Sequence, residues 1–380
     1  MNSRKPLVVF NAHLLAGDAS YRSAGISVYI ANLLRALDLA NLDYRFQILM
    51  GHGYLPDGVR FPVVRSRLST AQPWRRLLWE QAVMPGWLRR LQVDLLHAPA
   101  FVGPLLTRRR QVITVHDLSF LRYPEYFRRG NRTYLRMMTR LACRRATAVI
   151  AVSDFTAGEV VRLLGVPEDR VFRVYNGVDP RFRPLPEAEV ARFRREEGLP
   201  DRFVLAMGTL EPRKNLIRLI RAFARLKDPG LHLVLAGGCG WFYGDIFAEV
   251  EHFGLVDRVH FPGYVSAESQ PFWYNAARAS AYVSMYEGFG LPVVEALACG
   301  TPTLTSSTTS LPEVGGDSVL TVPPDDEAAM ADALHTLVSD EGVRGQLRQQ
   351  GLERAAAFSW KKTAEGTMDV YAWALGAQGN

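Results

Sequence analysis

Short runs of apolar and β-branched residues recur along the first half of the chain, and stretches with helical periodicity lie between them. The apolar runs predict buried strands, and the periodic stretches predict helices. Strands are predicted at 7–12, 45–50, 94–99, 112–117, 148–153 and 171–178, and helices at about 25–39, 72–91, 125–146 and 154–164. Continuous apolar strands that alternate with helices are typical of a parallel sheet covered on both faces.

A proline-rich stretch, DPRFRPLPEAEV at 179–190, interrupts this alternation and predicts a linker. The alternation then resumes. Strands are predicted at 203–208, 231–238, 258–263, 280–285 and 301–306, and helices at about 214–227, 242–253, 267–278, 290–299, 325–338 and 341–357. A chain of 380 residues suits two cores better than one. We therefore predict two Rossmann-like, doubly wound α/β domains.

Polar side chains stand at the ends of several predicted strands, where doubly wound sheets bind their ligands. Two such domains are predicted to face each other across a cleft, and the chemistry is expected there. His116 lies near the end of the strand at 112–117 and is followed by Asp117, which makes it a candidate catalytic residue. His97 fits a satisfied core histidine better.

Two cations, Arg213 and Lys214, follow the strand at 203–208 and precede a helix. Cations at a helix N-terminus oppose the helix dipole, which favours acids there. Their position is explained when an anionic ligand lies between them and the helix, so we predict a phosphate site. The glycine cluster at 237–240 is a weaker signal, because glycines after a strand are often only a tight turn.

Residues 287–302 read EGFGLPVVEALACGTP, with two glutamates around a glycine turn at a predicted helix start. Glycines allow a ligand to approach the backbone closely, and the N–H groups of 289–291 would point at an anion there. Glu295 lies one turn down the same helix face, where an acid suits a ribose diol attached to the phosphate. Glu287 precedes the turn and can accept hydrogen bonds from sugar hydroxyls. The stretch is therefore interpreted as a clamp on a nucleotide diphosphate sugar.

Together these stretches resemble the retaining glycosyltransferases of family 4, also called group 1, which have the GT-B fold. The resemblance covers nearly the whole chain, and its most specific motif is E-x7-E, here Glu287 to Glu295. The matching stretches are VHDLSF (115–120), NGVDPRFRP (176–184), GTLEPRKN (208–215), LAGGCGW (235–241), VHFPGYVS (259–266), YEGFGLPVVEALACGTPTLTS (286–306) and AAAFSWKKTA (355–364). The resemblance implies an acceptor-binding domain at 1–180, completed by a C-terminal helix at 360–380, and a donor-binding domain at 181–359.

The resemblance also implies roles for the matched positions. The implied donor-binding residues are Gly25, Gly208, Arg213, Lys214, Val265, Glu287, Phe289, Gly290, Leu291 and Glu295, and the implied catalytic residues are His116, Glu287, Arg213 and Lys214. Glu287 and His116 would contact the donor sugar, Glu295 the ribose, and the two cations the diphosphate. Many members have two glycines in the first loop, whereas SAGISVY (23–29) has only Gly25, so its phosphate contact is implied less strongly.

The implied reaction moves a hexosyl unit, with mannosyl from GDP-mannose favoured, to a glycan or lipid-linked acceptor in cell-surface polysaccharide synthesis. No cofactor is expected. No Asp-x-Asp pair stands at a strand end, so no metal is expected either, and Arg213 and Lys214 would take its place. Three alternatives stay open: a transferase with a soluble acceptor, a sugar-nucleotide-binding protein without turnover, and a nucleic-acid-binding protein.

The net charge of +7 conceals an asymmetry between the two halves of the chain. Residues 1–190 carry 28 Lys and Arg against 15 Asp and Glu, whereas 191–380 carry 17 against 23. Eleven arginines lie in 108–145, interleaved with Phe, Tyr, Leu and Met, against Asp117 and Glu125. A basic surface with aromatic side chains suits an anionic membrane or a lipid-linked acceptor. No nucleic-acid-binding motif accompanies it, so we expect no nucleic-acid partner.

The cysteines and the hydropathy of the chain indicate its cellular compartment. Cys143, Cys239 and Cys299 lie far apart, which argues against a disulfide framework or a zinc site and fits a reducing cytosol. No apolar run of about 18 residues predicts a spanning helix. The apolar patch near the N-terminus is too brief for a signal peptide and is predicted as a buried strand. We therefore expect a cytoplasmic protein, peripheral at the inner face of the membrane.

Overall fold

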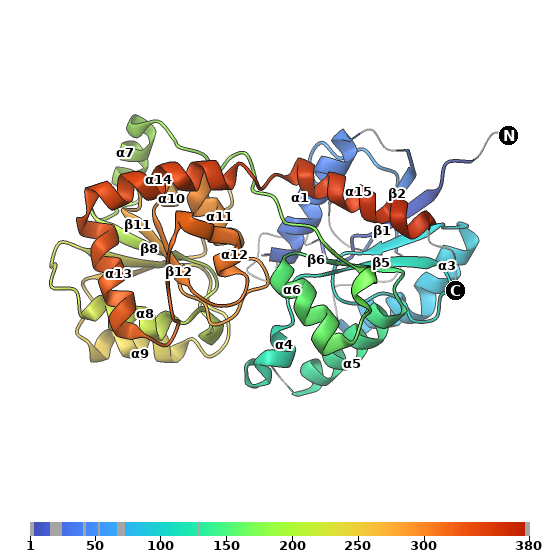
Figure 1. Cartoon of the computed structure of the whole chain (residues 1–380), viewed down its shortest axis with the longest axis horizontal. Coiled ribbons are helices and arrows are strands. Elements are labelled where there is room, and N and C mark those ends of the chain that lie inside the picture. The colour runs from blue at the N-terminus through green and yellow to red at the C-terminus, as the bar shows by residue number, and fades with distance from the viewer. Residues whose placement is uncertain are drawn as a thin grey trace. The chain divides into compact units, whose positions relative to one another are not determined.

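The computed structural model of the chain describes residues 4–15, 25–40, 43–51, 54–66, 73–127 and 129–376. The chain divides into two compact units. The N-terminal unit comprises Met1–Gly177 with Trp360–Asn380, and the C-terminal unit comprises Val178–Ser359. The first boundary thus follows Gly177 rather than residue 180. Each unit is an α/β domain with one parallel sheet, as the alternation of strands and helices predicts (Figure 1).

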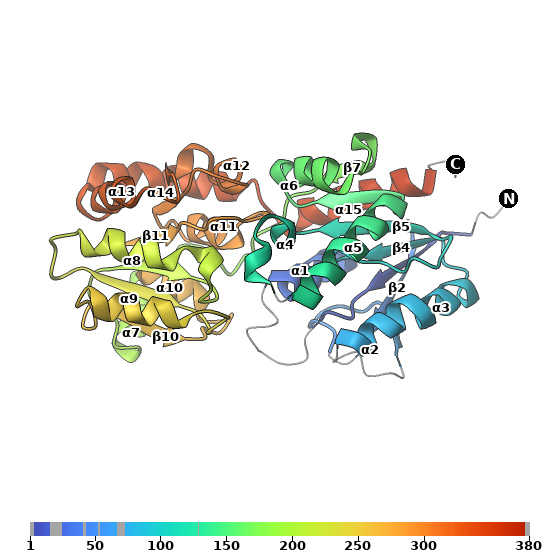
Figure 2. The same ribbon diagram turned by 90° about the horizontal axis from the view of Figure 1, so that it is seen from below.

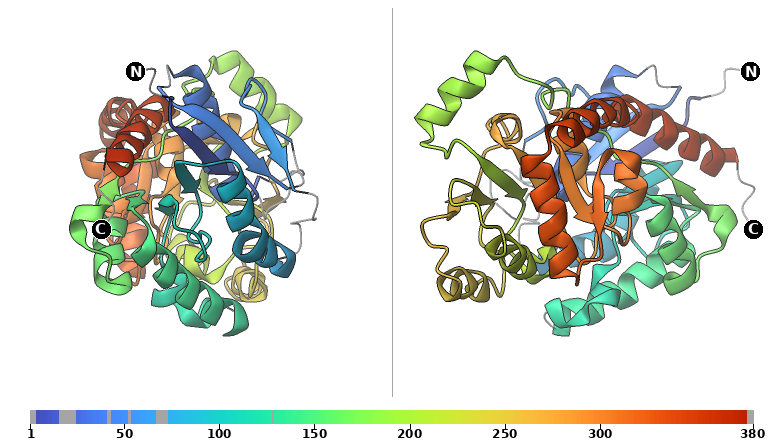
Figure 3. Two further views of the ribbon diagram at one scale, coloured as in Figure 1. Left: turned by 90° about the vertical axis from the view of Figure 1, so that its right-hand side faces the viewer. Right: turned by 60° about the vertical axis from the view of Figure 1, so that its left-hand side comes forward.

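The sheet of the N-terminal unit has seven parallel strands in the order β3-β2-β1-β4-β5-β6-β7. The strands are β1 (Leu7–Asn11), β2 (Arg45–Met50), β3 (Val63–Arg65), β4 (Leu95–Ala98), β5 (Arg110–Val115), β6 (Ala148–Ala151) and β7 (Val171–Arg173). The blue strands run side by side in the left view of Figure 3. Strand numbers increase from β1 toward one edge of the sheet and from β4 toward the other edge. The topological switch point therefore lies between β1 and β4.

Helices and short turns connect the strands of the N-terminal unit. They are α1 (Gly25–Leu39), α2 (Pro73–Leu78), the π-helical turn η2 (Trp79–Val83), α3 (Met84–Arg90), α4 (Ser119–Arg122), η3 (Pro124–Tyr126), α5 (Arg129–Arg145), α6 (Asp154–Glu159), η4 (Val160–Leu164) and η5 (Glu168–Arg170). Helix α6 begins where the sequence predicts it, because Ser153 Oγ accepts a hydrogen bond from the N–H of Thr156 at 3.0 Å.

The C-terminal helix α15 (Trp360–Gly376) belongs to the N-terminal unit, as Figure 2 shows. It packs against α1 and against β4, β5 and β6. Tyr371 on this helix is fully buried, and its hydroxyl lies 2.6 Å from Nδ1 of His97. Nε2 of His97 lies 2.8 Å from Oγ1 of Thr114. The interpretation of His97 as a satisfied core histidine is therefore confirmed.

The C-terminal unit has six parallel strands in the order β10-β9-β8-β11-β12-β13. The strands are β8 (Phe203–Met207), β9 (His232–Ala236), β10 (Val259–Gly263), β11 (Ala279–Tyr282), β12 (Thr303–Ser306) and β13 (Leu320–Val322). The helices and turns are α7 (Glu187–Glu196), η6 (Pro212–Lys214), α8 (Leu216–Ala224), α9 (Gly244–His252), α10 (Gln270–Ala276), α11 (Leu291–Ala298), α12 (Leu311–Gly315), η7 (Gly316–Ser318), α13 (Glu327–Ser339) and α14 (Glu341–Ala355).

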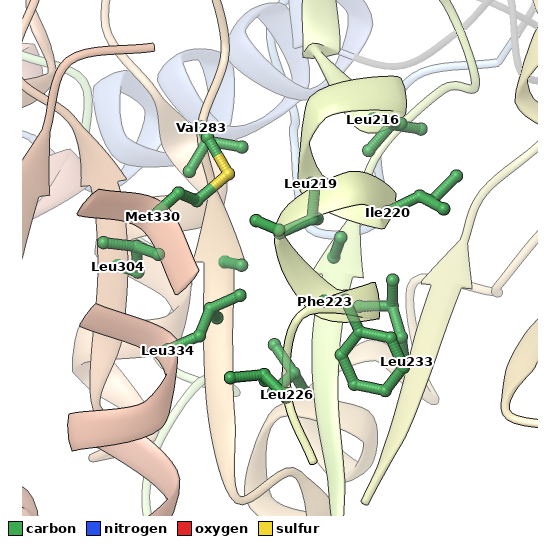
Figure 4. Close-up of a cluster of buried hydrophobic side chains, with 14 of the residues drawn as sticks. Leu216, Leu219, Ile220, Phe223, Leu226, Leu233, Val283, Leu304, Met330 and Leu334 are labelled. Carbon is green, nitrogen blue, oxygen red and sulfur yellow. The ribbon is translucent and has the colours of Figure 1, made fainter. Parts of the chain in front are cut away.

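An apolar stripe on α8 anchors the core of the C-terminal unit. Leu216, Leu219, Ile220 and Phe223 recur at the spacing of one helix face, and all are buried. Figure 4 shows them beside side chains of the sheet and of α13. This packing fixes the start of α8, and therefore the residues of η6 just before it.

The proline-rich linker prediction is wrong in its last residues. Helix α7 begins at Glu187, directly after Pro186, which is its N-cap. Acids in its first turn and arginines in its last turn suit the helix dipole. Four short elements, β3, α4, α12 and β13, were not predicted, because segments of three to five residues carry little periodic signal.

No helix among the described residues is long and apolar enough to cross a bilayer. The apolar patch near the N-terminus forms the buried strand β1, as predicted. The three cysteines are free thiols, and Cys143 and Cys299 are buried.

Candidate active site

Two glycines let the loops after β8 and β9 touch. Gly208 and Gly237 have φ values of +146° and +155°, and a Cβ on Gly237 would lie 2.0 Å from the carbonyl oxygen of Gly208. The N–H of Leu210 donates to the carbonyl of Gly238 at 2.9 Å, and the N–H of Gly240 donates to Leu210 at 3.0 Å. The glycine cluster therefore does more than make a tight turn, because it fixes the loop that carries the two predicted cations.

Arg213 and Lys214 both pair with Glu287. Lys214 Nζ lies 2.7 Å from Oε1 of Glu287, and an Arg213 guanidinium nitrogen lies 3.0 Å from Oε2. Arg213 also pairs with Glu211 at 2.7 Å, and the Tyr282 hydroxyl donates to Glu287 Oε1 at 2.9 Å. We call Glu211, Arg213, Lys214 and Glu287 the charge cluster. It joins the end of β8 to the loop after β11.

The electrostatics of the charge cluster favour the ionised carboxylate. Burial alone would raise the pKa of Glu287, but Arg213 and Lys214 outweigh it and lower that pKa to about 2. Burial lowers the pKa of Lys214, which Glu287 opposes. The side chains of Arg213 and Lys214 keep 17% and 13% of their surface exposed. Both cations are thus held in place by carboxylates while they still border solvent.

The glycine turn at 288–290 has a steric explanation. Gly290 is the N-cap of α11 with a φ of +96°, and a Cβ there would lie 2.6 Å from a methyl group of Leu311. Phe289 is buried, and its ring centroid lies 5.7 Å from that of Phe358. Helix α11 begins at Leu291, so the positive end of its dipole lies at this turn, although Pro292 has no N–H and the N–H of Val293 donates to the carbonyl oxygen of Gly290 at 3.0 Å. Its N-terminus can therefore bind an anion.

Glu295 lies one turn into α11 and does not join the charge cluster. The Tyr274 hydroxyl donates to its Oε2 at 3.0 Å. Burial raises the pKa of Glu295 to about 7, although Tyr274 and Arg181 oppose the rise. Val265 follows β10 and is buried. The binding roles implied for Glu295 and Val265 stay predictions.

His116 lies in the N-terminal unit, at the end of β5. Its Nε2 donates to the carbonyl oxygen of Pro99 at 2.7 Å. Its ring packs edge-to-face on Tyr29, with 4.7 Å between the ring centroids. Burial lowers the pKa of His116, so the imidazole is neutral at pH 7 and Nδ1 keeps its lone pair.

The carboxylate of Asp117, which follows His116, binds Ser119. Its Oδ1 accepts from the N–H and the hydroxyl of Ser119, at 2.9 and 2.7 Å, at the start of α4. A short polar side chain before a helix commonly binds the backbone in this way. Gly25 opens α1, and a Cβ there would meet nothing within 4 Å, so packing does not require a glycine.

Two tyrosines of this region were missed by the sequence reasoning. Tyr282 ends β11 and contacts Glu287 and Lys214, and Tyr274 on α10 binds Glu295. Tyr282 could have been found, because it lies within a predicted buried strand just before the glutamate motif. Tyr274 gave no comparable signal, since it lies within an ordinary apolar helix.

Comparison with known proteins identifies the family. Residues 188–354 match the glycosyl transferases group 1, and residues 23–182 match Glycosyltransferase Family 4. The chain is 33% identical over 294 residues to O-antigen chain mannosyltransferase B of Escherichia coli, covering 75% of this chain and 76% of the relative. The chain belongs to the group 1, family 4 glycosyltransferases.

Other relatives of this glycosyltransferase extend the comparison. It is 29% identical over 396 residues to a D-inositol 3-phosphate glycosyltransferase of Streptomyces bingchenggensis, covering 94% and 86% of the two chains. Sucrose-phosphate synthase of Thermosynechococcus elongatus has the same fold, with a TM-score of 0.80, 24% identity and 99% and 100% coverage. Anabaena HepE, solved with UDP and glucose, has a TM-score of 0.77, 20% identity and 97% and 100% coverage. The predicted GT-B fold is therefore confirmed.

Proposed function

We propose that this glycosyltransferase moves a hexosyl unit, with mannosyl favoured, from a nucleotide diphosphate sugar to a glycan or lipid-linked acceptor. The proposal includes retention of the anomeric configuration and a role in cell-surface polysaccharide synthesis. The similarity to O-antigen chain mannosyltransferase B supports the sugar and the pathway class. The observation that carries the proposal is the charge cluster, which holds Arg213 and Lys214 in fixed positions at the end of β8.

The cations act where negative charge develops. As the bond from the anomeric carbon to the diphosphate oxygen breaks, the sugar becomes oxocarbenium-like and the leaving group gains charge. Arg213, Lys214 and the N-terminus of α11 stabilise that charge without reorganising, because their positions are already fixed. The acceptor hydroxyl attacks the anomeric carbon, and its proton passes to the leaving phosphate oxygen. Glu287 and the neutral His116 contact the donor sugar in this proposal.

Binding of the donor is tested by thermal shift with GDP-, UDP-, dTDP- and ADP-sugars. GDP-mannose at a hundredfold excess over its Kd is expected to raise the Tm by roughly 5 °C or more. The UDP-, dTDP- and ADP-sugars show whether binding depends on the guanine base. If none of the four shifts the Tm, the assignment of a nucleotide-sugar donor fails.

A second candidate function is transfer to a soluble acceptor. The similarity to a D-inositol 3-phosphate glycosyltransferase favours it. An acceptor screen distinguishes the two, because only the first candidate transfers mannose to a glycan or lipid-linked glycan and leaves inositol 3-phosphate unchanged.

Turnover is expected to need no divalent metal. Arg213 and Lys214 supply the positive charge that a metal ion would otherwise bring to a leaving diphosphate. Transfer rates with EDTA should equal those with added magnesium or manganese. A rate abolished by EDTA and restored by either ion would contradict this prediction.

One face of α5 is proposed to meet an anionic membrane surface. Arg136, Met137, Arg140 and Leu141 are exposed on this face, with 55% of Met137 and 42% of Leu141 accessible. Not all of the basic segment is available, because Arg122 pairs with the buried Glu159 and other arginines of 108–145 bind backbone carbonyls. Charged and apolar side chains on one helix face suit a lipid interface.

Changing both Arg136 and Arg140 to Glu is expected to weaken binding to anionic vesicles at least about tenfold at low salt. The matched control changes Arg192 and Arg195, which are exposed on α7, to Glu. Co-sedimentation at low and high salt provides the measurement. Equal binding of wild type to neutral and anionic vesicles would leave this face as ordinary solvated surface. Salt-sensitive binding to anionic vesicles would support the peripheral membrane contact expected from the sequence.

A further inference from the structure

The loop after β12 carries a residue with a strained backbone. Thr309 has a φ of +64°, in the left-handed region, although its side chain is β-branched. Among the described residues, no other β-branched side chain has a positive φ. Such a conformation costs free energy, persists only where the surrounding contacts require it, and is concentrated at functional sites. The contacts of Thr309 therefore indicate what the strain maintains.

The hydroxyl of Thr309 connects this loop to the start of the glycine turn. Its Oγ1 accepts a hydrogen bond from the backbone N–H of Glu287 at 3.3 Å and donates to the carbonyl oxygen of Thr308 at 2.6 Å. The next residue, Ser310, donates from Oγ to the carbonyl oxygen of Glu287 at 3.0 Å. Both backbone polar groups of Glu287 thus bind side chains of this one loop.

Ser310 does not use its hydroxyl as serine commonly does at a helix start. It is the N-cap of α12, where serine usually accepts from an N–H of the first turn, but its side chain makes no capping hydrogen bond. Ser310 is fully buried, and its hydroxyl binds Glu287 instead. The following Leu311 has a methyl group 2.6 Å from where a Cβ on Gly290 would lie. The loop therefore contacts the glycine turn at both ends.

We propose that Thr309 and Ser310 are positioning residues, which fix the backbone of Glu287 and thereby direct its carboxylate at the two cations of the charge cluster. The carboxylate lies 2.7 Å from Lys214 and 3.0 Å from Arg213, so a rotation of the backbone at Glu287 would move it away from both. The inference rests on the proposed function, in which Glu287 contacts the donor sugar. Thr309 and Ser310 act through Glu287 and need no contact with the donor.

Three substitutions at Thr309 separate the hydroxyl from the strain, with kcat for mannose transfer from GDP-mannose and the Tm measured for each. Thr309→Val keeps the shape and loses the hydroxyl, and kcat is expected to fall about tenfold. Thr309→Gly also loses the hydroxyl but relieves the strain, so kcat should fall as much while the Tm exceeds that of Thr309→Val. Thr309→Ser keeps the hydroxyl and should restore most of the rate. The matched control is Thr336→Val on α13, where the lost hydroxyl donates to the carbonyl oxygen of Asp332 at 3.0 Å.

Action through Glu287 is tested by combining Thr309→Val with Glu287→Gln. Because both changes disturb the same group, the double variant should be slower than Glu287→Gln by no more than about twofold. Losses in kcat that multiply in the double variant would show that Thr309 acts independently of Glu287 and would overturn the inference. Rates that follow the Tm across the three Thr309 variants would also overturn it, because they indicate a structural role alone.

Hydrogen exchange of the Glu287 amide in the free chain provides a readout that needs no donor. Loss of the acceptor should speed this exchange at least about fivefold in Thr309→Val and Thr309→Gly, but not in Thr309→Ser. A wild type without turnover of GDP-mannose overturns the proposed donor, and the exchange rates still decide whether Thr309 holds Glu287. Unchanged exchange in Thr309→Val, or folded variants without the hydroxyl that keep wild-type kcat, overturns the positioning role.

Discussion

Alanine at Arg213 or Lys214, or glutamine at Glu287, is expected to lower kcat about 100-fold or more. Each change removes a fixed group near the place where the leaving diphosphate gains charge, and loss of one such group typically costs that much. The rate of mannose transfer from GDP-mannose provides the measurement. Arg221→Ala is the matched control, because Arg221 pairs with Glu249 at 2.6 Å outside the charge cluster.

Glutamine is chosen at position 287 for a physical reason. Removal of the Glu287 side chain would leave Arg213 and Lys214 without their common carboxylate, and breaking such a buried pair costs about 3–5 kcal/mol of stability. Glutamine keeps the shape and some hydrogen bonds. Melting temperatures of all variants are therefore measured beside the rates. Folded variants with wild-type turnover would remove the charge cluster from the mechanism.

Alanine at Gly237 is expected to destabilise the C-terminal unit by about 4 kcal/mol or more. The new Cβ would lie 2.0 Å from the Gly208 carbonyl oxygen, and a φ of +155° is a conformation that alanine rarely adopts. Urea denaturation gives the free energy of unfolding. The loops after β8 and β9 must separate in this variant, so donor binding should be lost with the stability.

The matched control for Gly237→Ala is Gly244→Ala. Gly244 begins α9, and a Cβ there meets nothing within 4 Å, so alanine should be neutral or slightly stabilising. Equal free energies of unfolding for the two variants would show that the loops after β8 and β9 separate without cost.

The sequence predicts the alternation of strands and helices well because buried parallel strands are continuous apolar runs. Edge strand β3 has no such run, since its residues are half-buried or exposed, and it was missed. Helix α7 was hidden by the prolines before it, although Pro186 occupies a position just outside the helix that proline tolerates. The prolines therefore predicted a linker, although they directly precede a helix.

The sequence also predicts which residue types gather at the strand ends, but not their pairing. Glu287 was expected to face sugar hydroxyls, and nothing in the sequence predicts that it pairs with Arg213 and Lys214, because tertiary folding alone brings them together. Asp117 likewise makes a contact that the sequence does not predict, because its carboxylate accepts a local hydrogen bond from Ser119. The catalytic role expected for His116 stays a prediction.

A groove in the C-terminal unit is a rival place for a ligand. This groove of about 670 Å³ beside the edge strand β10 is lined by residues that include Phe247, His260 and Trp273. None of the residues that line this groove belongs to the charge cluster. A method that reports where a nucleotide binds can therefore decide between the two places.

Hydrogen exchange with and without GDP is that measurement, because it reads the backbone amides of both places at once. The account predicts slower exchange at 208–215, where the loop after β8 carries the two cations, and at 287–292, where α11 begins. Exchange at the groove beside β10 should stay unchanged. Protection confined to that groove, or no change at 208–215 and 287–292 at saturating GDP, would contradict the assignment of the donor site.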